Sequence, residues 1–295
     1  MPNSVVVKFT KHGSPLTAKD SRADDAVNAT FGSNHAGRFV KKLLDSSDKF
    51  KAINSKLNEA YNWHKSVTMP YLDNGMRELN CEYLEKYIEK IGTFKVETQG
   101  LLLDLKPVWD EEVTKDIEKM AGLGNASDYP QWKEVEFKYS IDVKILPKPQ
   151  AEDFRCAVDQ SIIDELAHMK EQAKIEGRKE IFGKVEKLCN VAIEQCTKDK
   201  GKIYDSMLGN MVDQADLIEI LNIHNDVELD GMCTSLRTVA ESTNTFNLRN
   251  DVMVRTALAN RCRDFLGRLN SGGFAVEQET TVTPVAETTL VDSLV

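Results

Sequence analysis

Met69-Pro70-Tyr71-Leu72-Asp73-Asn74-Gly75 interrupts a stretch of helical periodicity that runs from Ala36 to about Leu105. Before this interruption two rows of apolar residues recur at a spacing of seven, the second of them broken at Ser46, and a third row follows it. The rows are Leu43, Phe50, Leu57 and His64; Phe39, Ile53, Ala60 and Val67; and Leu84, Tyr87, Ile88, Ile91, Phe94 and Leu101. Such rows are typical of amphipathic helices, the first about 48 Å long at 1.5 Å per residue. Two helices joined by a short turn predict an antiparallel hairpin over residues 36–106.

Two segments favour β-structure. Ser4 to Thr10 is a Val-rich run, and the residues from Tyr139 to Ile145 alternate between apolar and polar, as in a half-buried strand. Because a lone strand leaves its backbone groups unpaired, we expect the two segments to pair. The predicted fold is mainly α: a long antiparallel helical hairpin or coiled-coil bundle with a small two-stranded β element.

Helical periodicity returns in the second half of the chain. One apolar row comprises Phe154, Val158, Ile162, Leu166 and Met169, and continues with Ile181, Val185, Leu188 and Ala192. Gly177 divides this row, which predicts one long helix or two end to end, long enough for a coiled coil. We therefore expect an N-terminal strand and flexible arm (1–35), the hairpin (36–106), short helices and a strand (107–150), a C-terminal helical region packing on the hairpin (151–270) and a disordered acidic tail (271–295).

Composition limits the class of protein. The formal net charge of −9 argues against a protein that coats nucleic acid or an anionic membrane. The sequence contains no run of about 18 apolar residues, so no membrane-spanning helix is predicted. The six cysteines form no CxxC pair, and no signal-peptide core precedes them, so we expect reduced thiols in a cytoplasmic protein.

The sequence contains no convincing catalytic, cofactor or metal motif. Gly177 to Val185 resembles a phosphate-binding loop, but five residues separate its glycines instead of four, and Val185 replaces the Ser or Thr that would hold Mg²⁺. The five histidines are far apart in sequence and form no metal-binding pair. His64, on the apolar seam, is expected to be a partly buried, hydrogen-bonded residue. We therefore predict a protein that is not an enzyme and holds no cofactor or metal.

The turn itself is the predicted interaction site. A hairpin tip would leave Met69, Tyr71 and Leu72 without obvious cover from the hairpin. Exposed apolar residues at such a tip indicate a contact, either with the C-terminal helices of the same chain or with another chain.

Three turn motifs resemble, in their order, a family of uncharacterised proteins from phages and mobile elements. They are Thr68-Met69-Pro70 with Gly75-Met-Arg-Glu-Leu79, Asn125-Ala-Ser-Asp-Tyr-Pro130, and Pro147-Lys-Pro149 with Asp153-Phe154-Arg155. The resemblance covers roughly residues 39–270. Members are often encoded near MoxR-type AAA+ ATPases and von Willebrand A-domain proteins, which implies an accessory or adaptor role in the cytoplasm of a host cell.

The leading hypothesis is a helical, phage-encoded protein that forms a homo-oligomer or acts as an adaptor for a phage or host protein, such as an AAA+ ATPase. One alternative is a single-stranded nucleic-acid-binding protein of phage replication or recombination. Its candidate contacts are Lys8, Lys11, Lys19, Arg22, Arg38, Lys41 and Lys42, with Arg255, Arg261, Arg263 and Arg268. A pore-forming hairpin is a third alternative, disfavoured because the apolar run from Leu101 to Leu105 is short and contains Asp104.

Overall fold

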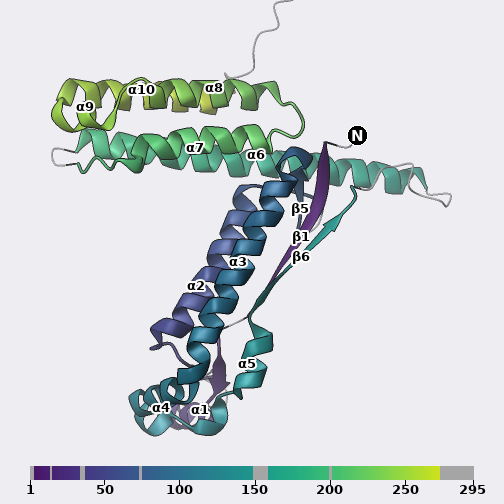
Figure 1. The fold of residues 1–295 in the computed structure, drawn as a ribbon, viewed down its shortest axis with the longest axis vertical. Coiled ribbons are helices and arrows are strands. Elements are labelled where there is room, and N and C mark those ends of the chain that lie inside the picture. The colour runs from purple at the N-terminus through teal and green to yellow at the C-terminus, as the bar shows by residue number, and fades with distance from the viewer. Residues whose placement is uncertain are drawn as a thin grey trace, which may run out of the picture. The chain divides into compact units, whose positions relative to one another are not determined.

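The computed structural model describes residues 3–13, 15–33, 37–72, 75–148, 159–198 and 201–272. The fold is mainly α with small antiparallel sheets, as predicted (Figure 1). The chain divides into two compact units. The first comprises residues 1–184 and 220–223, and the second comprises residues 185–219 and 224–295.

A four-stranded antiparallel sheet in the order β4-β5-β1-β6 lies in the first unit. The strands are β1 (Ser4–His12), β4 (Met69–Pro70), β5 (Met76–Asn80) and β6 (Ser140–Leu146). The predicted pairing of the two β-prone segments is confirmed, because β1 and β6 pair antiparallel with Val7 opposite Ile145. The sheet is larger than predicted, since β5 pairs with the other edge of β1 and β4 folds back on β5. A separate two-stranded sheet joins β2 (Thr17–Lys19) and β3 (Val40–Lys42).

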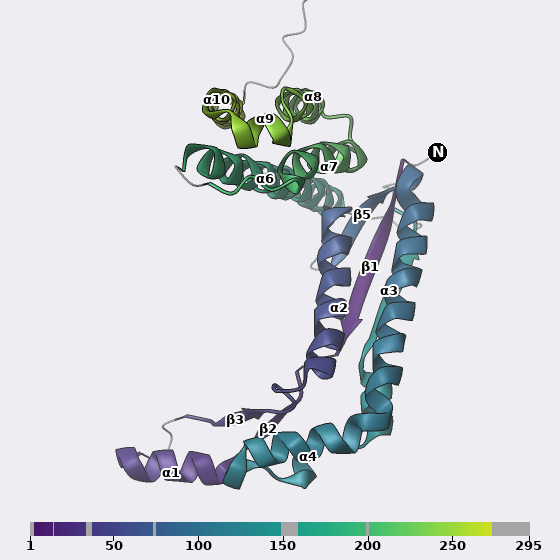
Figure 2. The ribbon, with the colours of Figure 1, turned by 60° about the vertical axis from the view of Figure 1, so that its left-hand side comes forward.

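Helices α2 (Asp48–Ser66) and α3 (Leu84–Leu105) lie side by side, with β1 next to them (Figure 2). Their contacts run in opposite directions along the chain: Lys56 pairs with Glu97 at 3.0 Å, and the rings of Trp63 and Tyr87 stack with centroids 5.4 Å apart. Because apolar side chains of both helices face inward, this pair supplies much of the core of the first unit.

The prediction of helix from residue 36 is wrong. Residues 40–42 form β3, and α2 begins only after Ser47, whose hydroxyl accepts a hydrogen bond from the Phe50 N–H. Leu44 has φ 57°, a left-handed conformation that cannot continue a right-handed helix. The apolar residues Phe39 and Leu43 therefore flank β3, in a loop and a turn, and their helical spacing is accidental.

The remainder of the first unit includes a buried carboxylate on α4. Its helices are α1 (Ser21–Phe31), α4 (Trp109–Lys119) and α5 (Trp132–Lys138), with 3₁₀ turns η1 (Cys81–Tyr83), η2 (Lys106–Val108), η3 (Ala121–Leu123) and η4 (Ala126–Asp128). Asp116 is 3% exposed and accepts hydrogen bonds from the Leu44 N–H at 2.6 Å, the Ser46 hydroxyl at 2.9 Å and the Tyr129 hydroxyl at 2.7 Å. Three donors satisfy a carboxylate that would otherwise be costly to bury.

Helix α6 (Gln160–Thr197) is continuous through Gly177, so a single long helix forms instead of two. Gly177 is explained by packing: a Cβ at this position would lie 2.3 Å from Met69 Cε and 3.3 Å from Pro70 Cδ. The predicted start of this helix, at residues 151–158, lies outside the described residues.

The second unit is a helical bundle. Besides the end of α6 it contains α7 (Ser206–Leu221, of which residues 206–219 belong here), α8 (Val227–Glu241), α9 (Thr245–Asn250) and α10 (Val252–Ser271). Helices α8 and α10 form one layer and α6 and α7 the other (Figure 2). Residues between the layers are almost fully buried: Cys189, Ala192, Met211, Ala215, Ile218, Met232, Leu236, Leu258, Ala259 and Cys262. The predicted acidic tail, beyond residue 272, lies outside the described residues.

Candidate functional site

The turn predicted to be an interaction site is largely buried within the first unit. Met69 and Tyr71 are 5% and 4% exposed, and Leu72 is half-buried. The expectation that they form an exposed tip is therefore wrong for the first two. The reason is the β4–β5 pairing, which places Met69 opposite Glu78 and returns the turn to the sheet. The turn was expected to contact either the C-terminal helices of its own chain or another chain. In the structure Met69 packs against Gly177 on α6 of the same chain.

Beside this turn lies a cavity of about 400 Å³, bounded by α2, the β4–β5 turn and the first half of α6. Arg77 fixes one wall: its guanidinium donates to the Thr68 carbonyl at 2.6 Å and the Thr68 hydroxyl at 2.7 Å, and pairs with Glu180 on α6 at 2.9 Å. His64 also lines the cavity. Its pKa is lowered to about 3 by burial and by the charges of Arg77 and Lys65, so its ring is neutral at pH 7.

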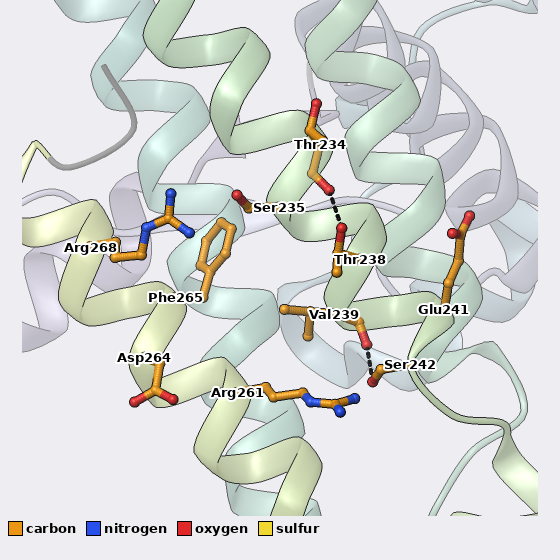
Figure 3. A pocket seen from close by; sticks show the side chains of 10 residues that line it. All are labelled: Thr234, Ser235, Thr238, Val239, Glu241, Ser242, Arg261, Asp264, Phe265 and Arg268. Carbon is orange, nitrogen blue, oxygen red and sulfur yellow. Dashed lines mark hydrogen bonds between the residues drawn. The ribbon is translucent and has the colours of Figure 1, made fainter. Parts of the chain in front are cut away.

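The second unit carries a more open groove between α8 and α10, with a volume of about 710 Å³ (Figure 3). Buried Val239 and Phe265 form its apolar floor. On α8 the side chains at its edge are hydroxyls at a spacing of four, Thr234, Thr238 and Ser242, which donate to carbonyls of their own helix at 2.7–3.0 Å. Those hydroxyls retain lone pairs and present a polar wall to the groove.

The opposite wall of the α8–α10 groove is basic. Arg261 and Arg268 project from α10, and in Figure 3 both guanidinium groups extend toward α8. The two acidic side chains at the groove point elsewhere: Asp264 points away from α8, and Glu241 away from α10 (Figure 3). Arg261 forms no ion pair with any residue that the structure describes. The guanidinium groups of Arg261 and Arg268 therefore lie beside the apolar floor of the groove.

The structure separates the residues predicted to contact nucleic acid. Lys8 and Lys11 lie on β1, whereas Lys19 and Lys42 lie on the β2–β3 sheet. Lys41 is buried, pairs with Asp20 at 3.1 Å and with Asp128 at 2.5 Å, and donates to the Leu123 carbonyl at 2.9 Å. A surface ligand has no access to Lys41, so its prediction as a contact is wrong. Arg22 and Arg38 are exposed, and Arg255, Arg261, Arg263 and Arg268 share α10.

A further surface was recognised in the sequence only as part of a helical row. The apolar stripe of α6 is buried from residue 173 to its end, at Ala173, Gly177, Ile181, Val185, Cys189, Ala192 and Cys196. The same stripe begins earlier, at Ile162, Leu166 and Met169. There Ile162 is 46% exposed and Met169 37% exposed, with Leu166 half-buried. Within the described residues, the first three turns of the stripe therefore lack the cover that the later turns have.

Two classes of site receive no support. Nowhere in the described ranges do three or more His, Cys, Asp or Glu side chains gather as they would around a metal ion. Among the same residues, no helix has the length and apolar character needed to cross a membrane. Comparison of the chain with protein-family models, with curated proteins and with solved structures gives no match. The resemblance to phage proteins therefore stays a prediction.

Proposed function

We propose that the protein acts by self-association, through the exposed start of the α6 stripe. The single observation behind this proposal is the change in burial along one helix: the stripe is covered from Ala173 onward and uncovered at Ile162 and Met169. The occupant that fits best is a second copy of the chain. Ile162, Leu166 and Met169 are spaced by four and three, the spacing of a coiled-coil seam. Two identical seams can cover each other in a symmetric dimer.

The energetics suggest a reversible association. Fully burying an exposed large aliphatic side chain contributes roughly 1.5–3 kcal/mol. Ile162, Leu166 and Met169 are each less than half exposed, so covering them in both copies gives a gross gain of at most about 7 kcal/mol. Loss of translational and rotational freedom costs about 4–15 kcal/mol. The gain and the cost are of similar size, so the dimer should be weak and should form only at high protein concentration. The predicted adaptor role toward a phage or host protein, such as an AAA+ ATPase, belongs to this same proposal.

Sedimentation velocity over 1–200 µM protein tests the proposal. We expect a concentration-dependent dimer for the wild type and a monomer for Leu166→Glu and Met169→Glu, which place a carboxylate in the seam. Ile175→Glu is the matched control, because Ile175 is 51% exposed on the same helix and lies off the stripe. A wild-type monomer at 200 µM, or equal dissociation by the control variant, would exclude self-association through this stripe.

A further inference from the structure

We propose that the α8–α10 groove binds the acidic C-terminal segment of its own chain, residues 273–295. The groove offers two arginines, a wall of hydroxyl groups and an apolar floor. The segment contains Glu277, Glu279, Glu287 and Asp292, and it has no Lys or Arg. It also begins with an apolar pair, Phe274 and Val276, next to the first two glutamates. Its chemistry is therefore complementary both to the floor and to the basic wall.

Chain geometry allows this contact within one molecule. Helix α10, which carries both arginines, ends at Ser271, and Gly272 follows in the left-handed conformation with φ 69°. Gly273 comes next, so two glycines stand where the chain would have to reverse direction. Arg261 and Arg268 are seven residues apart, about 10.5 Å along the helix. Residues 274–279 span up to about 20 Å when extended, enough to run back past both arginines.

Covalent connection favours this occupant over a separate acidic peptide. A segment tethered a few residues from its site has an effective concentration in the millimolar range, which a free peptide in a cell rarely reaches. Individual exposed ion pairs are weak, so the contact should be reversible and sensitive to salt. The segment would then occupy the groove until a competing anionic ligand displaces it. This inference concerns the second unit and does not depend on self-association through α6.

Limited digestion of the full-length protein with elastase, followed by intact-mass spectrometry, tests the proposal, because elastase cleaves after the small apolar residues that this segment contains. We expect Arg261→Glu with Arg268→Glu to raise the rate of cleavage within residues 274–295 by roughly 5- to 30-fold. Arg261→Gln with Arg268→Gln should have a smaller effect in the same direction. Arg263→Glu is the control, since Arg263 is exposed on the same helix and does not line the groove.

A charge exchange makes the test specific. Glu277→Arg with Glu279→Arg should also accelerate cleavage, and combining it with the two Arg→Glu changes should restore protection. Circular dichroism should show an unchanged helical content in every variant. Equal cleavage of the wild type and the double Arg→Glu variant would overturn the proposal, as would equal acceleration by Arg263→Glu. Protection that depends on protein concentration would assign the groove to the segment of a second copy and overturn binding within one chain.

Discussion

The imidazole Nδ1 of His64 on α2 lies 2.8 Å from the hydroxyl of Tyr87 on α3. The Phe9 ring stacks on the imidazole from β1, with centroids 4.9 Å apart. The His64 side chain of α2 thus contacts both α3 and β1. Because His64 is 1% exposed, its ring is accommodated only in the neutral form.

This burial predicts a pH-dependent stability. The folded-state pKa of His64 is lowered to about 3, whereas an unfolded chain binds the proton near pH 6.5. Between these values the unfolded state holds more protons, so the free energy of unfolding decreases as the pH falls below 6.5, by up to about 1.4 kcal/mol per pH unit. At pH 5 the His64 contribution should have fallen by roughly 2 kcal/mol.

Urea unfolding followed by tryptophan fluorescence can measure this effect, since all three tryptophans lie in the first unit. His64→Gln keeps a neutral side chain at every pH. The stability difference between the wild type and this variant should therefore shrink by roughly 2 kcal/mol from pH 7.5 to pH 5.0. A difference that stays constant over this range would show that His64 is not held neutral by the fold.

Gly177 packs against the end of the Met69 side chain, so a large side chain at this helical position should be costly. Gly177→Leu would place atoms where Met69 and Pro70 now pack, and we expect a loss of about 1–3 kcal/mol from overpacking. Gly183→Leu is the control on the same helix, because its Cβ would meet no other atom within 4 Å. That change should be neutral or stabilise the protein by up to about 1 kcal/mol.

A double variant identifies the cause. Met69→Ala removes the atom that the Gly177 side chain would meet, so Gly177→Leu should cost less in its presence than alone. Additive costs, measured by urea unfolding, would mean that α6 does not pack on the β4–β5 turn in this way.

Lys41 and Lys42 are neighbours on β3, but we expect only the replacement of Lys41 to lower the melting temperature. Replacing Lys41 with Met would leave Asp20 and Asp128 without their shared cation, and we expect the melting temperature to fall by roughly 5–10 °C. Lys42→Met, at an exposed position, should change it by less than about 1 °C. Differential scanning calorimetry would decide, and similar small shifts for both variants would mean that Lys41 is solvated.

The cysteines of the second unit should resist alkylation. Cys196 and Cys233 are 6% and 3% exposed, and burial raises the pKa of each thiol to about 11. At pH 8 only about one in a thousand of such buried thiols is ionised, so we expect iodoacetamide to label them far more slowly than half-buried Cys81. Peptide mass spectrometry after short pulses measures the ratio. Rapid labelling of Cys196 or Cys233 without denaturant would show that the bundle opens readily.

Local patterns in the sequence were sufficient for several features. The two-residue alternation around Ile141 identified β6, and the need to satisfy its backbone identified β1 as its partner, as the register of Val7 opposite Ile145 shows. The position of His64 on a heptad row predicted its burial and hydrogen bond. These inferences succeeded because side-chain period and backbone pairing are properties of short segments.

What covers each face depended on contacts between distant parts of the chain, and only the tertiary structure decided it. Met69 is buried because β5 pairs with β1 and because α6, more than 100 residues later, presents a glycine to it. Lys41 is buried because the turns near residues 123 and 128 bring a carbonyl and a carboxylate to it. The sequence by itself determined the longer helices, the strands β1 and β6, and which of their faces are apolar. It could not determine which of those faces remain exposed, as at Ile162 and Met169, because exposure depends on the partner and not on the period of the segment.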